Sequence, residues 1–386
     1  MDWRTKLLNP NPKVRRDYKS LVTPVYRGST VLFDQQALVK DDWKQEQKGF
    51  SYGLYGTPTS LELAARIAEI EQAHHTFIVP GGQAAITLVY LTFCESGSHV
   101  LIPDSVYGPN LEMAHGLLQK FGVDVEVYDP LIGVDIVRHI RPTTKLIWCE
   151  SPGSVTMEVQ DTPAIVNAAK KLGVTVALDN TYAAGVLFDA FSHGVDISIQ
   201  ALTKYVGGHS DLLLGSVSVK TNKDFDLIGE TYKQIGLAVS PDDCSLALRG
   251  LQTLAIRLDY LEKSAKKLAD WLSQQPLVET VFHPALASCP GHVFWKRDFC
   301  GSASVFSFVL SKRLPIEEIE KFLNALEIFK LGLSWGGINS LAVMYPNVKR
   351  QRKNFEGNLI RLNVGLEDPD DLIKDLERGM RALQQK

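Results

Sequence analysis

The sequence has few cysteines and no pattern among them. Its 386 residues include five cysteines, an odd number, and no two of them have the CxxC spacing. This usage argues against a disulfide framework and against a structural zinc site. We therefore expect no metal site, and we expect a reducing location such as the cytoplasm.

Long apolar runs and a strong excess of one charge are also missing. No apolar segment approaches the roughly 20 residues of a membrane span, and the N-terminus shows no apolar core of a signal peptide. A net charge of -3 gives no electrostatic reason to bind nucleic acid. We interpret the one dense basic run, 349–353, as a solvated face or loop. We expect neither nucleic-acid nor membrane partners.

Apolar strands alternate with helical stretches from about 58 to 240, which is typical of a mostly parallel sheet with helices on both faces. The predicted strands are 76–79, 99–102, 123–128, 145–149, 174–178, 197–201 and 213–219. The predicted helices are 60–72, 83–94, 109–121 and 163–172. One or two long helices over 242–274 then lead to a smaller mixed region. Its predicted elements are strands 304–310 and 359–364 and helices 315–325 and 369–384.

Residues 1–55 are turn-rich and carry little helical periodicity. We interpret them as an arm that reaches a partner subunit. The predicted organisation is therefore an arm (1–55), a first α/β domain (56–242) and a C-terminal domain (243–386).

Lys204 is the first candidate for chemistry. It lies in the run TKYVGGHSD (203–211), after an apolar stretch and with no carboxylate before Asp211. A lysine amine becomes a nucleophile when burial or a nearby cation lowers its pKa. Its typical reaction is a Schiff base with a carbonyl, as in pyridoxal phosphate (PLP) enzymes. The alternative is a surface lysine whose stem lies on apolar neighbours.

Asp179 ends a predicted buried strand, and ligands of open α/β sheets bind at the carboxyl ends of strands. PLP needs an acid there to keep its pyridine nitrogen protonated. A turn or helix-capping aspartate is the alternative. Lys204 follows the next predicted strand, so the two side chains are expected at the same edge of the sheet. Together they favour a PLP site over a surface lysine and a turn or helix-capping aspartate.

A third signal is the turn Gly81-Gly82-Gln83 between a predicted strand and a predicted helix. Free amides at a helix N-terminus bind phosphate, and glycines allow the close approach. An ordinary tight turn is the alternative. The glycine spacing matches neither a dinucleotide-binding fingerprint nor a P-loop.

These motifs, with LDNT (178–181) and the Tyr52-Gly53 arm, resemble the Cys/Met-metabolism PLP enzymes, and the resemblance covers essentially the whole chain. Three further stretches are most similar to the bacterial cystathionine β-lyases of that family: DPLIG (129–133), ESPGSVTME (150–158) and SWGG (334–337). The resemblance implies the fold of the type I PLP-dependent transferases. That fold has a mostly parallel seven-stranded sheet with flanking helices and a smaller α+β C-terminal domain.

The resemblance also implies a cofactor site of pyridoxal 5'-phosphate. Lys204 would bind PLP covalently and later move the substrate Cα proton, and Asp179 would pair with the ring nitrogen. Tyr107 would stack on the ring. The phosphate would be bound by the amides of Gly82 and Gln83, by the hydroxyl of Thr203, and by Tyr52 of a neighbouring subunit.

On the substrate side, the resemblance assigns Arg361 to the α-carboxylate. An arginine inside an apolar strand needs an anionic partner, and a buried ion pair with a protein acid is the alternative. Ser334 and Trp335 would line the site, and Glu112 would face the distal amino group of cystathionine. Tyr107, Tyr52 or Lys204 would give a proton to the leaving sulfur.

The implied reaction is α,β-elimination of L-cystathionine, a small sulfur amino acid, to homocysteine, pyruvate and ammonia. Within the family the alternatives are a γ-lyase, a γ-synthase or a cysteine desulfhydrase, with amino-acid racemisation as a side activity. Outside it, they are a Schiff-base aldolase without cofactor and a non-catalytic protein of the same fold. The resemblance further implies a dimer with shared active sites, commonly paired into a homotetramer.

Five positions depart from the family pattern. Leu54 stands where relatives usually have an arginine that contacts the phosphate across the dimer, so another group must compensate. Tyr55 replaces a second arginine that some β-lyases have. Ala201 replaces a phosphate-binding serine of many relatives, and Ile338-Asn339 replaces an expected aromatic–acid pair.

Overall fold

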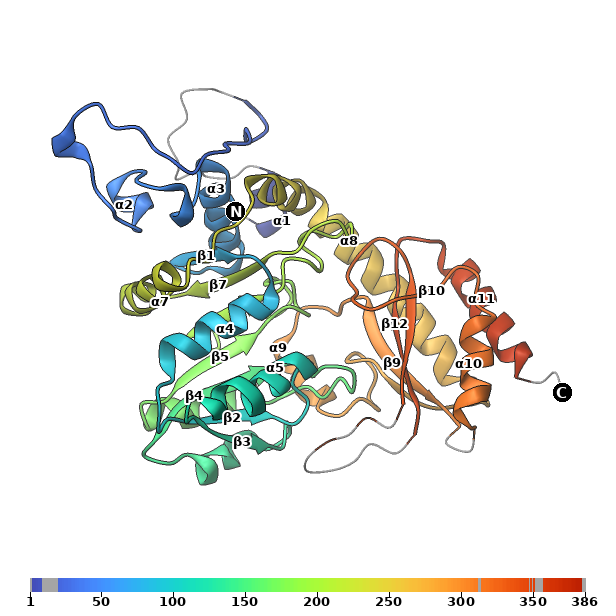
Figure 1. Cartoon of the computed structure of the whole chain (residues 1–386). Helices are drawn as coiled ribbons and strands as arrows, with labels where there is room; N and C mark the ends of the chain where they lie inside the picture. Colours follow the sequence, from blue (N-terminus) through green and yellow to red (C-terminus); the bar gives the residue numbers. More distant parts are fainter. Residues whose placement is uncertain are drawn as a thin grey trace.

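A seven-stranded sheet forms the centre of the first half of the chain in the computed structural model, which describes residues 2–8, 20–311, 314–346, 348, 350 and 357–383. The strand order is β1-β7-β6-β5-β4-β2-β3. β7 is antiparallel to both of its neighbours, and the other neighbouring pairs are parallel (Figure 1). The strands are β1 (His75–Val79), β2 (His99–Pro103), β3 (Asp124–Tyr128), β4 (Thr144–Glu150), β5 (Thr175–Asp179), β6 (Ile197–Gln200) and β7 (Gly215–Val219). The predicted mostly parallel sheet is confirmed.

Helices cover both faces of this sheet, because most of its strands are apolar on both sides. In β4, Ile147 and Cys149 face one apolar cluster while Leu146 and Trp148 face the other. The first cluster is formed with α3 (Pro58–Glu71), α6 (Thr162–Lys171) and α8 (Pro241–Ser273). The second is formed with α4 (Gly82–Phe93), α5 (Gly108–Met113), its continuation η3 (Ala114–Leu118) and α7 (Asn222–Ile235).

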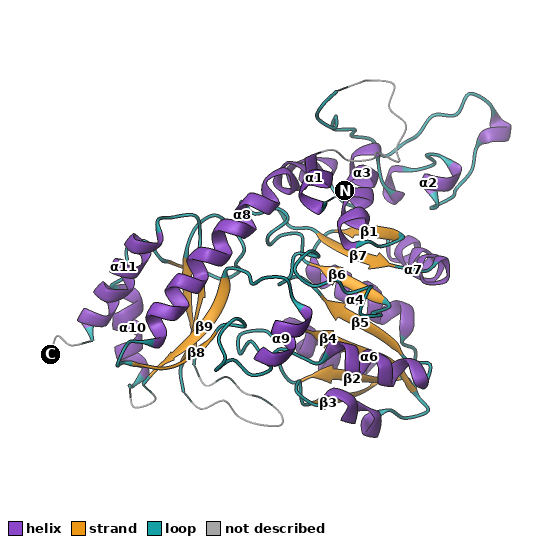
Figure 2. Cartoon of the chain, turned by 180° about the vertical axis from the view of Figure 1, so that it is seen from behind, coloured by secondary structure: helices purple, strands orange, loops and turns teal. Residues whose placement is uncertain are grey.

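The single long helix α8 connects the first half of the chain to the second (Figure 2). Its start is well defined, because the Ser240 hydroxyl accepts from the amides of Asp242 and Asp243 and Pro241 occupies the first turn. Its early turns contact α3, and its later turns contact α11 (Pro369–Ala382) and β8 (Val278–Phe282). The predicted one or two helices over 242–274 are thus a single helix, Pro241–Ser273.

A five-stranded sheet, in the order β10-β11-β12-β9-β8, forms the second half. Its remaining strands are β9 (Val305–Leu310), β10 (Lys330–Leu331), β11 (Leu341–Tyr345) and β12 (Leu359–Asn363). One face packs Phe306, Phe308 and Leu362 against α10 (Ile316–Asn324), α11 and the end of α8. On the other face, Leu359 joins the cluster of the first half. Because side chains alternate along a strand, Arg361 and Asn363 also face the first half of the chain.

The structure contains elements that periodicity did not predict. These are α7, α9 (His292–Asp298), β8, β10 and β11, with the short helices α1 (Trp3–Leu8), η1 (Gln36–Leu38), α2 (Gln45–Lys48), η2 (Gly53–Tyr55) and η4 (Gly133–His139). The predicted helix 109–121 is divided into α5 and the π-helical η3. α1 buries Leu7 against α3 and α8, so the first residues pack on their own chain. Contact of the arm with a partner subunit remains a prediction. The proposed boundaries near 56 and 243 remain predictions.

Among the described helices, none has both the length and the apolar character needed to cross a bilayer.

Asp375 fixes the turn between α10 and β10. It is buried on α11, and its carboxylate accepts hydrogen bonds from the amides of Glu327, Ile328 and Phe329 at 2.8, 2.8 and 2.9 Å. Removing it leaves three donors without a protein acceptor.

We therefore expect Asp375→Ala to lower the free energy of unfolding by about 3 kcal/mol, roughly one for each orphaned donor. Glu377→Ala on the same helix is the control. Its partner Arg381 is largely exposed, and exposed ion pairs contribute little. Urea denaturation curves of both variants provide the measurement. Equal midpoints would show that Asp375 is dispensable.

Candidate active site

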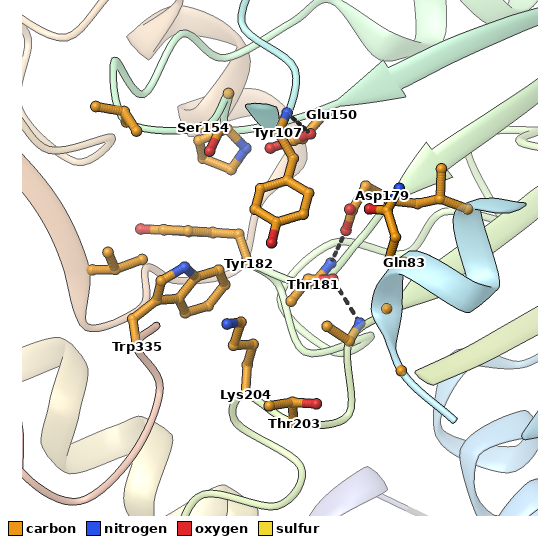
Figure 3. Close-up of a pocket in the computed structure, with 18 of the residues that line it drawn as sticks. Gln83, Tyr107, Glu150, Ser154, Asp179, Thr181, Tyr182, Thr203, Lys204 and Trp335 are labelled. Atoms are coloured by element: carbon orange, nitrogen blue, oxygen red, sulfur yellow. Dashed lines mark hydrogen bonds between the residues drawn. The ribbon is translucent and has the colours of Figure 1, made fainter. Parts of the chain in front are cut away.

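A cavity of about 350 Å³ lies where the carboxyl ends of β4 and β5 meet the N-terminus of α4 and the inner face of the second sheet. Figure 3 shows its residues converging from these elements. Most of the predicted site residues line it: Gly82, Gln83, Tyr107, Asp179, Thr203, Lys204, Trp335 and Arg361. Residues far apart in the sequence are therefore brought together as predicted.

Lys204 lies in the turn after β6 and points its amine into the cavity (Figure 3). Its Nζ donates to Ser334 Oγ at 2.6 Å and lies 5.2 Å from the centre of the Trp335 ring. Burial, and secondly the positive charge of Arg361, lower its pKa to about 8. Near neutral pH a useful fraction of this amine is therefore unprotonated, as a nucleophile or general base requires.

Asp179 is the last residue of β5, and it is paired in register with Glu150 of β4. Burial raises the pKa of Asp179, and the amide of Thr181, which donates to Oδ1 at 3.0 Å, opposes the rise. A buried carboxylate with this partner set can accept a cationic ring nitrogen, which would offset the cost of its burial.

Glu150 was quoted in a motif but given no role by sequence reasoning. Its Oε2 accepts from the amide of Tyr107 at 2.7 Å and so fixes the backbone that carries the Tyr107 ring. Burial, followed by the charge of Asp179, raises the pKa of Glu150 well above its usual range. Burial, followed by the charge of Glu150, also raises the pKa of Tyr107. The phenol therefore keeps its proton and remains a proton donor.

The phosphate end of the cavity is the start of α4. The chain leaves β1, turns at Gly81 and begins the helix at Gly82, with no acidic side chain in the first turn. A Cβ on Gly82 would lie 2.8 Å from the Cβ of Ala201, so only glycine allows this approach. The free amides of a helical first turn suit an anion. The hydroxyl of Thr203 bonds the backbone of Leu214 and would have to turn to reach a phosphate.

Arg361 is buried in the middle of β12 and donates from Nη2 to the carbonyl oxygen of Ser334 at 2.8 Å. The Tyr345 ring centre lies 5.3 Å from its guanidinium carbon. No carboxylate of the described residues forms an ion pair with it, which disfavours the alternative of a protein acid. Burial lowers its pKa, and an anionic ligand would supply the missing charge partner.

Three predicted residues are not among those that line the cavity of their own chain. Ser334 lies at its edge, where its Oγ accepts from the Lys204 amine. Tyr52 is 46% exposed on the arm, and Glu112 is exposed on α5. A role for Tyr52 therefore requires a second copy of the chain and remains a prediction, as does the role of Glu112.

The arm positions that depart from the family pattern pack within their own chain. Tyr55 is buried, and its hydroxyl donates to Asp41 Oδ1 at 2.7 Å. Leu54 is partly buried and packs against the second apolar cluster. In the part of the chain that the structure describes, Lys204 and Arg361 are the cavity's cations, so no additional cation faces its phosphate end.

The basic run 349–353 lies outside the described residues except for Arg350. The Arg350 guanidinium donates to the carbonyl oxygens of Asp104 and Ser154 at 2.7 and 2.9 Å, and also to the Thr156 hydroxyl. This residue therefore does not belong to a solvated face. Its hydrogen bonds connect the second half of the chain to the loop that contains Ser154, a residue that lines the cavity.

These residues fit PLP. An anion-binding helix start, an acid for a ring nitrogen and an aromatic ring for stacking surround an amine of lowered pKa in one cavity. A ligand with a phosphate and a carboxylate explains both the close contact at Gly82 and the guanidinium of Arg361, which has no carboxylate partner among the described residues.

Comparisons with known proteins agree. The model of the Cys/Met metabolism PLP-dependent enzyme family matches residues 4–381. The cystathionine β-lyase of Haemophilus influenzae is 40% identical, covering 99% of this chain and 98% of its own. The L-alanine/L-glutamate racemase of Wolbachia pipientis wMel is 37% identical, covering 95% and 94%. The crystal structure of cystathionine γ-lyase from Lactobacillus plantarum complexed with L-serine matches with a TM-score of 0.91 at 28% identity, over 100% of both chains.

We expect Gly82→Ala to weaken PLP binding about tenfold, the equivalent of one lost charge-assisted hydrogen bond. The new methyl group would push the start of α4 away from Ala201 and displace its amides. Titrating apoprotein with PLP and following visible absorbance gives the dissociation constant. Gly116→Ala, whose Cβ meets nothing within 4 Å, is the control. An unchanged constant for Gly82→Ala would argue against this phosphate site.

Proposed function

The chain belongs to the Cys/Met metabolism PLP-dependent enzyme family, and we propose that it converts L-cystathionine and water into homocysteine, pyruvate and ammonia by α,β-elimination. One observation carries the proposal. Ser334 accepts from Lys204 through its Oγ and from Arg361 through its carbonyl oxygen. The amine that would take the Cα proton and the guanidinium that would bind the α-carboxylate are thereby fixed relative to each other.

PLP, when bound, supplies an electron sink for the charge that develops at Cα. Arg361 binds the α-carboxylate and orients the substrate. Lys204 removes the Cα proton, since its pKa of about 8 suits a general base. Asp179 would pair with the ring nitrogen of PLP, and the amides of Gly82 and Gln83 would bind its phosphate.

The bond between sulfur and Cβ then breaks, and sulfur takes a proton. Tyr107 is our first candidate for the donor, because it lines the cavity and its raised pKa keeps the phenol protonated. Lys204, and Tyr52 of a second copy, are the other candidates. Homocysteine leaves as the thiol, and water converts the remaining three-carbon fragment to pyruvate and ammonia.

Racemisation is the second candidate, because it needs only removal and return of the Cα proton by these same residues. The Wolbachia racemase likeness favours testing it. Pyruvate as product identifies β-elimination, 2-oxobutyrate identifies γ-elimination, and a D-amino acid without keto acid identifies racemisation. Cystathionine, cystine and cysteine are the substrates to compare.

We also propose a dimer with shared active sites, paired into a tetramer, in the cytoplasm. The exposed apolar side chains of the arm support the dimer, because Leu21 and Leu32 are 94% and 91% exposed in the single chain. The position of Tyr52 outside its own cavity agrees with a role in a neighbouring one. The scattered, unpaired cysteines support the cytoplasm.

Lys204→Ala should abolish pyruvate formation, to less than about a thousandth of the wild-type rate, because it removes the base. The fold should be unchanged by far-ultraviolet circular dichroism. In the wild type, kcat should rise with pH as Lys204 loses its proton, because the base must be unprotonated to take the Cα proton. Turnover above that limit in the variant would contradict the role of Lys204.

Leu54→Arg should tighten PLP binding if the arm reaches a neighbouring phosphate, because it supplies a cation that the described cavity lacks there. Equilibrium titration with PLP, at low and at high salt, measures the effect. Gln36→Arg, at an exposed polar position elsewhere on the arm, is the control for added charge alone. Equal affinities in Leu54→Arg and the wild type would show that another cation already fills this role.

A further inference from the structure

Ser334 is held in a conformation that it would not adopt unaided. It is not a glycine, yet its φ is +71°, a region that costs side-chain-bearing residues roughly 1 kcal/mol or more. Such a backbone persists only where its surroundings fix it. In this conformation Ser334 Oγ lies 2.6 Å from Lys204 Nζ.

Two neighbouring positions on the same face of β12 hold the residues around Ser334. Arg361 donates to the carbonyl oxygen of Ser334 at 2.8 Å. Asn363, two residues further along the strand, accepts through Oδ1 from the amide of Gly336 at 2.8 Å. Its Nδ2 donates to the carbonyl oxygen of Asn339 at 2.9 Å. The segment from 334 to 339 is thereby attached to β12 at three points.

Asn363 is also linked to the backbone next to Lys204. Its Oδ1 accepts a second hydrogen bond, from Ser304 Oγ at 2.9 Å, so the Ser304 hydroxyl must in turn accept from the hydroxyl of Tyr205 at 3.0 Å. Tyr205 follows Lys204 in sequence, and its ring lies 5.4 Å from that of Trp335. These three polar side chains are almost fully buried, so water does not replace a lost partner readily.

The contacts close a ring. It runs from Lys204 through Tyr205, Ser304 and Asn363 to Gly336, and returns through Ser334 to the amine of Lys204. Gly336 packs tightly against Lys204, since a Cβ there would lie 3.1 Å from the Lys204 backbone. Asn363 connects the two sides of this ring, because its Oδ1 accepts from Ser304 on one side and from Gly336 on the other.

We propose that Asn363 is a positioning residue, which holds Ser334 in its left-handed conformation so that Ser334 Oγ keeps the amine of Lys204 aimed into the cavity. The inference rests on the proposed function, in which Lys204 acts on the cofactor and on the substrate Cα proton. Loss of Asn363 leaves the Gly336 amide and the Ser304 hydroxyl without an acceptor, so the Ser334 segment relaxes away from Lys204.

The test is a double-mutant cycle on the PLP-loaded enzyme, using Asn363→Ala, Ser334→Ala and the double variant. Kinetics on L-cystathionine give kcat and KM, and visible circular dichroism reports the asymmetric setting of the bound cofactor. Asn363→Ala should lower kcat on the order of tenfold to a hundredfold, as expected for an ångström-scale misplacement, with a smaller change in KM. It should also reduce the visible dichroism.

Added to Ser334→Ala, Asn363→Ala should lower kcat by less than about threefold further, because residues that act through one contact are not additive. Ser307→Ala is the control. This serine is buried in the neighbouring strand β9, and none of the described residues forms a hydrogen bond with its hydroxyl, so kcat and dichroism should match the wild type.

Wild-type kcat and dichroism in Asn363→Ala would overturn the inference. So would an equal loss in both backgrounds, because Asn363 would then act independently of Ser334. If Asn363→Ala fails to fold, Ser304→Ala replaces it in the same cycle, with the same direction of effect and the same non-additivity expected. The proposed function is tested separately by the visible absorbance band of the wild type, which Lys204→Ala should remove. If the wild type lacked such a band, the proposed function would be contradicted, and the inference with it.

Discussion

The hydrogen bond from Lys204 Nζ to Ser334 Oγ joins two parts of the chain that lie 130 residues apart. Lys204 belongs to the turn after a strand of the first sheet, whereas Ser334 precedes β11 of the second. The cavity exists because the inner face of the second sheet lies over the carboxyl ends of the first. Every group that could act on a ligand there depends on this placement, and Ser334 is where the amine and the carboxylate-binding guanidinium meet.

Charge in the cavity is divided between two sides. Asp179 and Glu150 end adjacent strands of the first sheet, and burial raises both of their pKa values. Lys204 and Arg361 lie opposite, and burial lowers the pKa of each. Neither pair neutralises the other directly in the hydrogen bonds and ion pairs of the described residues. The site is therefore prepared for a ligand that brings a cationic ring nitrogen to one side and anionic groups to the other.

Local pattern was sufficient for the strands of the seven-stranded sheet and for the residues at their ends, but it did not predict β8, β10 or β11. Asp179, Lys204 and the glycine turn at Gly82 each follow an apolar run, so their convergence could be predicted from parallel-sheet geometry. The antiparallel direction of β7 could not be predicted, because the residue pattern of a short apolar strand is the same for a parallel and an antiparallel neighbour. Asn363 was missed because its role lies in contacts with distant residues, although its position two residues after Arg361 placed it on the same face.

The family resemblance gave the cofactor and the reaction class. The roles that it implies for Tyr52 and Glu112 cannot be assigned within a single chain, because neither residue lines the cavity of its own chain.

The most direct test of the central claim is borohydride reduction of the PLP-loaded protein, followed by mass spectrometry of its peptides. The account predicts a phosphopyridoxyl group on Lys204 and on no other lysine in stoichiometric amount. Labelling of a different lysine, or no labelling above the level of the Lys204→Ala variant, would contradict it.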